Sequence, residues 1–421
     1  MRIFIFHLLT PILGLSLLLG GAKNLIAAGE VEVLHWWTSG GEATALRVIK
    51  DNLQKKGVSW VDMPIAGGAG VNAMTVLRAR VSSGKPPTAV QLLGFDITSW
   101  AEEDVLADLN DLAKQENWNK VIPQPLQDFA IYKGKWVSVP INVHSTNWVW
   151  ANKAIFDKLN LAVPTNWNEF KLAVEKIKKA GIIPIAHGGQ PWQDATIFDS
   201  LVMVAGGADF YKKAFLDLDA KALGSKTMEK AFSYLRFIRA NLDPNFSGRD
   251  WNLASSMVIE GKAAMQIMGD WAKGEFVKAD QVAGKDFICF RFPGTQGNVT
   301  FNADQFAMFK LGKSQKVNQD KLALVIADKD TQARFNQIKG SVPARIDISD
   351  AGFDACGKKG IKDLRESAAN GTMMGSMAHG YAAPPAVKNA VFDVVTKFFN
   401  DEKVTPAKAA KMLAVAVAIA Q

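Results

Sequence analysis

Two adjacent tryptophans, Trp36 and Trp37, and a carboxylate that follows them closely, Glu42, form the group in this chain best suited to binding chemistry. An indole covers an apolar face of a ligand, and a carboxylate accepts hydroxyl protons, so the trio suits a polyhydroxylated ring without requiring catalysis. Adjacent tryptophans can also be core residues. The glycine-rich turn Ser39–Gly41 after an apolar run favours a pocket, since ligands of α/β folds bind beyond the carboxyl ends of strands.

Short apolar runs alternate with helical patterns after residue 30. They predict strands over 31–36, 58–65 and 89–93 and helices over 42–56 and 71–82. This βαβαβ order favours a parallel sheet. The run Gly67–Gly70 has neither the Gly-Lys-Ser/Thr of a Walker loop nor the spacing of a dinucleotide turn, so we interpret it as a loop at a lobe edge.

The rest of the chain continues with helices and strands. Helices are expected over 167–179, 194–205, 226–241 and 252–260, strands over 263–267, 287–292 and 304–309, and further helices from Asp320, Asp363, Ala386 and Thr405. A chain of 421 residues with 48% apolar content exceeds one core and fits two lobes. No low-complexity linker joins them, so we expect crossings in short strands and closure by hinge bending.

The N-terminus predicts export. Arg2 precedes an apolar stretch from Ile3 to Leu19, and small residues around Ala28 precede the first charged strand, which indicates a signal peptide over 1–28. A retained membrane anchor is the alternative, but Pro11 interrupts a stretch that is already short for a membrane span. We therefore expect the protein in the periplasm, on the outer side of the inner membrane.

Charge and cysteine content narrow the function classes. The net charge is +8, with basic and acidic residues interspersed and no zinc-finger or RNP-type motif, which argues against nucleic acid as a partner. Cys289 and Cys356 are the only cysteines, and an oxidising compartment favours their pairing, although their spacing alone leaves it open. No metal-ligand motif is present, so we expect neither a metal nor a cofactor.

Two blocks of the sequence resemble the extracytoplasmic sugar-binding proteins of bacterial ABC importers. The first block comprises the segments 133–140, 148–156 and 164–170. The second block is the later segment 263–271, which ends in Met268-Gly269-Asp270-Trp271. The likeness covers nearly the whole chain after the leader. The start Trp36–Glu42 and the segment Ala378–Gly380 are most similar to glucose-binding members from Gram-negative bacteria and thermophiles.

The resemblance implies an α/β, two-lobe periplasmic-binding-protein fold of type II, with two mixed or parallel sheets flanked by helices. The hinge would consist of short strands crossing near Asn142, Phe301 and Val342. The first lobe would comprise 29–142 plus 302–342, and the second 143–301 plus 343–421. The protein would be a monomeric binding component rather than an enzyme, closing on D-glucose or a similar monosaccharide and delivering it to inner-membrane permease subunits.

The resemblance also implies a set of ligand-binding residues. Aromatic faces would pack on the ring from both lobes, acceptors and a lysine donor would bind its hydroxyls, and groups that both donate and accept would complete the polar ring. The set is Trp36, Trp37, Glu42, Gln91, Trp251, Trp271, Asn302, Asp304, Lys339 and His379.

Three other histidines receive different interpretations. His35 alternates to the opposite face of its strand, so we expect it to pack in the core. His187 is expected to be structural, and so is His144, although the position of His144 in a presumed crossover would also let it line the cleft.

Two alternatives to glucose binding stay open. The same fold could bind mannose, galactose or a disaccharide, because inverting one hydroxyl changes a single contact. A secreted glycoside hydrolase is the other alternative, with Glu42 and Asp304 as its acid and base.

Overall fold

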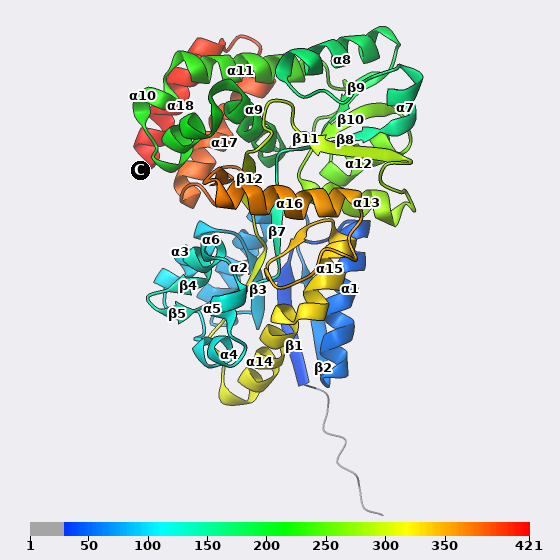
Figure 1. Ribbon diagram of the computed structural model, residues 1–421. Coiled ribbons are helices and arrows are strands. Elements are labelled where there is room, and N and C mark those ends of the chain that lie inside the picture. The colour runs from blue at the N-terminus through cyan, green and yellow to red at the C-terminus, as the bar shows by residue number, and fades with distance from the viewer. Residues whose placement is uncertain (1–28) are drawn as a thin grey trace, which may run out of the picture.

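The computed structural model describes residues 29–421. The predicted signal peptide, 1–28, lies outside the described residues. Within 29–421, no helix combines the length and apolar character needed to cross a membrane. The elements form two stacked lobes joined by a narrow region of short strands (Figure 1).

The first lobe is built on a five-stranded sheet. Its strand order is β2 (Val58–Pro64), β1 (Gly29–His35), β3 (Ala89–Leu92), β13 (Gln305–Met308) and β6 (Ser138–Pro140). The strands β1, β2 and β3 are parallel, as the βαβαβ pattern predicts, but β13 runs antiparallel to both of its neighbours. The sheet is therefore mixed, and a strand from late in the chain occupies its interior.

Helices cover this sheet, and the first of them shows why they form. In α1 (Gly40–Lys55), Ala45, Ile49 and Leu53 recur every four residues and are buried against the sheet. The other elements of this lobe are η1 (Gly68–Gly70), α2 (Val71–Ser82), α3 (Phe95–Glu102), α4 (Asn110–Gln115), α5 (Trp118–Val121), α6 (Gln124–Ala130), the hairpin β4 (Ile131–Tyr132) and β5 (Lys135–Trp136), α14 (Lys313–Ala327) and α15 (Lys329–Lys339).

The second lobe has a four-stranded sheet in the order β11 (Phe287–Arg291), β8 (Trp148–Asn152), β10 (Ala263–Ile267) and β9 (Ile183–Ala186). All residues of β8 and β10 are buried, because helices cover both faces. The helical elements here are α7 (Lys153–Lys158), α8 (Trp167–Lys179), α9 (Pro191–Tyr211), η2 (Lys212–Leu216), α10 (Ala220–Leu223), α11 (Lys226–Arg239), α12 (Trp251–Ile259), η3 (Asp270–Ala272), α13 (Lys273–Lys278), α17 (Pro385–Asn400) and α18 (Pro406–Ala420).

A third sheet lies between the lobes. Its order is β14 (Val342–Pro343), β7 (Asn142–Ser145), β12 (Val299–Asn302) and β15 (Met373–Gly375). The crossings predicted near Asn142, Phe301 and Val342 all fall in this sheet. Next to it, α16 (Ala355–Ala369) lies along the boundary between the lobes (Figure 1). The exact lobe boundaries stay a prediction.

Cys289 in β11 and Cys356 in α16 form a disulfide, with their Cα atoms 6.1 Å apart. The bond attaches the beginning of α16 to the sheet of the second lobe. The chain therefore becomes fixed to the second lobe within 14 residues of β14, so the last crossing is short.

Candidate functional site

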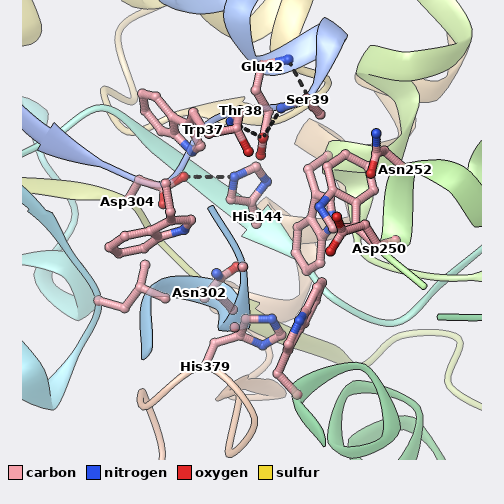
Figure 2. Close-up of a pocket in the computed structure, with 18 of the residues that line it drawn as sticks. Trp37, Thr38, Ser39, Glu42, His144, Asp250, Asn252, Asn302, Asp304 and His379 are labelled. Atoms are coloured by element: carbon pink, nitrogen blue, oxygen red, sulfur yellow. Dashed lines mark hydrogen bonds and ion pairs between the residues drawn. The ribbon is translucent and has the colours of Figure 1, made fainter. Parts of the chain in front are cut away.

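A cavity of about 170 Å³ lies between the two lobes, beside the third sheet. Nine of the ten residues in the predicted set line it, and they come from six separate stretches of the chain. These nine are Trp36, Trp37, Glu42, Trp251, Trp271, Asn302, Asp304, Lys339 and His379. Figure 2 shows that polar side chains surround the cavity, with Glu42 and His379 toward opposite ends of the view.

Indole rings reach the cavity from both lobes. Trp37 is held edge-on by Phe306, at 5.6 Å between ring centroids, and by Phe335 on another side. Trp36 packs over Gly70, where a Cβ would lie 2.9 Å from the indole. Trp271 stands edge-on to His144 at 5.2 Å and to His379 at 5.3 Å. The rings are thus fixed by their own packing before any ligand enters.

Glu42 contacts Thr38, Ser39 and Lys339 and also lines the cavity. Its Oε2 accepts hydrogen bonds from the backbone N–H groups of Thr38 and Ser39, and Ser39 Oγ accepts from Glu42 N, which forms a capping box at the start of α1. Lys339 Nζ donates to Oε1 at 3.2 Å. The carboxylate is therefore oriented, and its charge is balanced by a lysine that also lines the cavity.

Asp304 and His144 form the hinge end of the cavity. His144 Nε2 lies 3.0 Å from Asp304 Oδ2 (Figure 2). Its Nδ1 lies 2.5 Å from Asp270 Oδ1. Burial opposes charge on both groups, but the two carboxylates raise the pKa of His144, and the hydrogen bond and charge of His144 lower the pKa of Asp304 to about 2. This end therefore holds an imidazolium between two carboxylates. One of them, Asp270, belongs to the second lobe.

The structure corrects the role predicted for Gln91. Its side chain is fully buried behind the wall and does not line the cavity. Its Oε1 accepts from the Trp36 backbone N–H at 3.1 Å, and its Nε2 donates to Asp304 Oδ1 at 2.7 Å. Because both ends of the amide are occupied, Gln91 positions Trp36 and Asp304 instead of contacting a ligand.

Polar atoms of the described wall that have no partner lie at Asn302, which pairs with His144 in the third sheet, and at His379, toward the other end of the cavity (Figure 2). Among the described residues, Asn302 Oδ1 and His379 Nε2 are the buried side-chain atoms of the cavity wall that make no hydrogen bond. Burial and the nearby charge of His144 lower the pKa of His379 to about 3, so its ring is neutral. A buried polar atom without a partner costs about 1–3 kcal/mol, which a hydroxyl-bearing ligand would recover.

Contacts join the lobes on both sides of the cavity. On one side, Glu275 of α13 accepts from Ser39 Oγ at 2.6 Å and from Gly41 N at 2.9 Å, which places a carboxylate at the N-terminus of α1. On the other side, Phe95 N donates to the Gly380 carbonyl at 2.9 Å. These contacts belong to a closed arrangement of the two lobes.

Sequence reasoning missed several residues of the wall. Trp192 and Gln190 lie at the start of α9, which begins three residues before the predicted helix, and Asp250 and Asn252 flank the predicted Trp251. The remaining ones are Thr38, Ser39, Gly67, Gly68, Ala69 and Leu93. His144 also lines the cavity, as its position in a predicted crossover allowed. Gly67 and Gly68 belong to the run interpreted as a loop at a lobe edge, and they also line the cavity. His35 is buried and bonds to Asp62, as expected for a packed residue.

Residues 36–324 match the family model described as bacterial extracellular solute-binding protein. The chain belongs to that family. A relative from Rhizobium meliloti (strain 1021), named as a probable sugar-binding periplasmic protein, is 61% identical over 376 residues, 89% of this chain and 91% of the relative. A relative from Brucella melitensis biotype 1 with the same name is 58% identical over 407 residues, 96% of each chain. The family and these relatives are solute-binding proteins rather than enzymes.

Solved structures of other solute-binding proteins share the fold. A chitin oligosaccharide binding protein superposes with a TM-score of 0.79 at 20% identity, covering 93% of this chain and 99% of that one. The bacterial solute receptor AcbH, described as preferring β-D-galactopyranose, gives a TM-score of 0.78 at 17% identity, covering 94% of this chain and all of that one. The fold is the two-lobe type II fold that the sequence predicted.

Within residues 29–421, no group of three or more His, Cys, Asp or Glu side chains is placed to hold a metal ion. The cavity wall itself offers the hydrogen bonding, charge and aromatic packing described above. It fits a neutral ligand with an apolar face and several hydroxyl groups.

Proposed function

We propose that this protein is the periplasmic sugar-binding component of an ABC importer and that its ligand is a monosaccharide, D-glucose in the first instance. The observation that carries the proposal is the composition of the wall. Indoles from both lobes face a cavity whose polar ring includes carboxylates, a lysine, an amide and a neutral imidazole. The relatives named as sugar-binding periplasmic proteins support the class of ligand and the compartment.

The size of the cavity favours one sugar ring. Its volume of about 170 Å³ lies below the roughly 300–1,000 Å³ of pockets for drug-sized ligands. A disaccharide would need the lobes to stand further apart than they do here. Galactose and mannose differ from glucose at one hydroxyl each and remain the nearest alternatives.

The proposed mechanism is capture by closure. A sugar would bind one lobe of the open cleft, and the second lobe would add the remaining contacts, so ligand would shift the population toward the closed form that the permease recognises. The contacts of Glu275 with Ser39 and Gly41 support this, because they link the lobes without using the ligand.

Hydrolysis is a weaker proposal. Its acid and base would be Glu42 and Asp304, but each of these carboxylates is paired with a cation, Lys339 and His144 respectively. With a pKa of about 2, Asp304 holds no proton to donate to a leaving group.

The first experiment is calorimetric titration of refolded, sugar-free protein with glucose, galactose, mannose and maltose. Tight binding of glucose with a stoichiometry of one supports the proposal, and tight binding of another sugar alone reassigns the ligand. Absence of binding to all four, or turnover of aryl glycosides, would reject it.

Substitutions at two neighbouring glycines, Gly40 and Gly41, test closure of the lobes. A Cβ on Gly41 would lie 2.6 Å from the backbone of Gly274 across the cleft, whereas a Cβ on Gly40 would meet nothing closer than 3.5 Å. Gly41→Ala is expected to weaken sugar binding by at least about tenfold, and Gly40→Ala to leave it near wild type. If X-ray scattering gave equal radii with and without sugar for the wild type, closure would be excluded.

A further inference from the structure

A buried chain of hydrogen bonds runs from the second lobe to the cavity wall. Asp199, in α9, is fully buried and does not line the cavity. Its Oδ2 accepts from Ser376 Oγ at 2.6 Å, and Ser376 Oγ lies 2.8 Å from His379 Nδ1. His379 then presents its second ring nitrogen, Nε2, which has no partner in the protein.

The geometry decides which atom donates and which accepts in each of these hydrogen bonds. A serine hydroxyl has one proton, and a carboxylate at 2.6 Å is its strongest acceptor nearby. Because Ser376 donates its only hydroxyl proton to Asp199, its Oγ can only accept a hydrogen bond from His379. Nδ1 of the ring must then carry the proton. Because burial keeps the ring neutral, Nε2 is left with its lone pair.

Protonation of Asp199 does not reverse the direction. Its Oδ2 accepts from the backbone N–H of Ala378 at 3.2 Å as well as from Ser376. The hydroxyl of Tyr211 and the backbone N–H of Met377 also donate toward this carboxyl. Because Oδ2 already receives the hydrogen bonds of Ser376 and Ala378, a proton on the carboxyl is placed on Oδ1. Oδ2 therefore remains an acceptor whether Asp199 is ionised or neutral.

We propose that Asp199, acting through Ser376, holds His379 in the Nδ1–H tautomer, so that Nε2 accepts a hydrogen bond from a ligand hydroxyl. Asp199 and Ser376 are positioning residues, and His379 is the residue that touches the ligand. The tautomer follows from the protein alone, whereas the identity of the donor as a sugar hydroxyl rests on the proposed function. The unprotonated Nε2 of His379 makes this end of the cavity selective for a ligand group that donates a hydrogen bond. A ligand with an ether oxygen or a fluorine at that position is therefore rejected.

The tautomer is measured directly by NMR. Two-bond ¹H–¹⁵N spectra of labelled, sugar-free protein at pH 8 distinguish a protonated from an unprotonated ring nitrogen, and His379→Asn identifies the signals of His379. The expected result in the wild type is a protonated Nδ1 and an unprotonated Nε2. A wild-type spectrum with the proton on Nε2 would overturn the proposal, and this needs no variant to fold.

Two matched pairs of variants test the relay, that is, whether the hydrogen bonds from Asp199 through Ser376 set the tautomer of His379. Ser376→Ala and Asp199→Ala each remove one link, and the proton is expected to move toward Nε2. Ser376→Thr keeps the hydroxyl, and Asp199→Asn keeps one acceptor oxygen, which can take the place of Asp199 Oδ2, so both are expected to retain the wild-type tautomer. A folded Ser376→Ala protein with an unchanged His379 spectrum would show that the relay does not set the tautomer.

A ligand series tests the hydroxyl. D-glucose is compared with its mono-deoxy-fluoro derivatives, in which one hydroxyl at a time loses the ability to donate. One derivative is expected to lose about tenfold in affinity for the wild type, and the same derivative to lose little against His379→Ala. Equal losses in the two proteins at every position would refute the hydroxyl contact. Failure of glucose itself to bind would reject the proposed function, while the spectra would still decide the tautomer.

Discussion

The two ends of the cavity use the same pair of side-chain types to opposite effect. At the hinge end, His144 contacts Asp304 and Asp270 directly, and the ring is charged. At the other end, Ser376 stands between Asp199 and His379, and the ring is neutral. All of these side chains are buried, so burial alone does not decide the charge.

The comparison shows that the direct contacts of a buried imidazole decide its state. His144 has two carboxylates in contact, whereas His379 has a hydroxyl in contact and the charge of His144 nearby. Asp304, with an imidazolium in contact, has a pKa of about 2, whereas burial raises the pKa of Asp199, which has hydroxyl and amide donors, to about 7. The charged end links the lobes, and the neutral end presents an acceptor.

The largest effect is expected from removing the cation at the hinge end. His144→Ala leaves Asp270 and Asp304 buried without their shared partner, which should lower the free energy of unfolding by about 3–5 kcal/mol. Urea denaturation measures this. Adding Asp270→Asn should restore part of the loss, and a destabilisation below about 1 kcal/mol would show that His144 is not charged.

The pH dependence of the free energy of unfolding should reveal the raised pKa of Asp199, which lies behind the neutral end of the cavity. Since the pKa of Asp199 is raised to about 7 in the folded state, the folded protein holds a proton that the unfolded chain releases above about pH 4. The contribution of protonated Asp199 to the free energy of unfolding is present at low pH and is lost as pH rises through 7. The loss amounts to about 3 kcal/mol between pH 5 and pH 8.

Asp199→Asn removes this titration and leaves every other group in place. Unfolding of the variant and the wild type, followed from pH 5 to pH 8, should show a shallower loss in the variant. Parallel curves would mean that Asp199 titrates normally and that the two ends differ less than we infer.

The affinity for sugar should respond next, through Glu42. Glu42→Gln keeps a side chain that can complete the capping box with Ser39, so it removes charge with little disturbance of α1. A hydrogen bond to a charged group contributes about 1.5–3 kcal/mol, and the affinity for glucose should fall ten- to a hundredfold by calorimetry. An unchanged affinity would confine Glu42 to capping and to its ion pair with Lys339.

The smallest effect is expected at the neutral end. His379→Ala removes one uncharged acceptor, which corresponds to about 0.5–1.5 kcal/mol, or roughly two- to tenfold in affinity. Calorimetry should show this loss together with a stability much nearer to wild type than that of His144→Ala. A loss beyond a hundredfold would indicate that His379 is charged when ligand binds.

Three local elements were predictable to the residue. The helices α2 and α8 and the strand β10 have the predicted bounds. The helix α14 begins at Lys313 rather than near Asp320, because its first turns are mainly polar and carry no apolar stripe. The helix α16 begins at Ala355 rather than Asp363, and Gly357 and Gly360 disguise its start.

The site was predictable only as far as the family pattern reached. The predicted aromatic and charged residues line the cavity, but Gln91 does not, because its amide satisfies Trp36 and Asp304 behind the wall. The role of His144 depends on carboxylates 126 and 160 residues away in the sequence, and no local pattern signals such a pairing. Asp199 is likewise 177 residues from Ser376.

The position of β13 between β3 and β6 has a consequence for biosynthesis. The sheet of the first lobe cannot be completed until residue 308 has been made, whereas the strands of the second-lobe sheet all lie between residues 148 and 291. The lobe that starts first on the ribosome is therefore the later one to finish its sheet. Until then β3 and β6 expose unpaired edges, and a chain interrupted before β13 would be prone to pair with other chains.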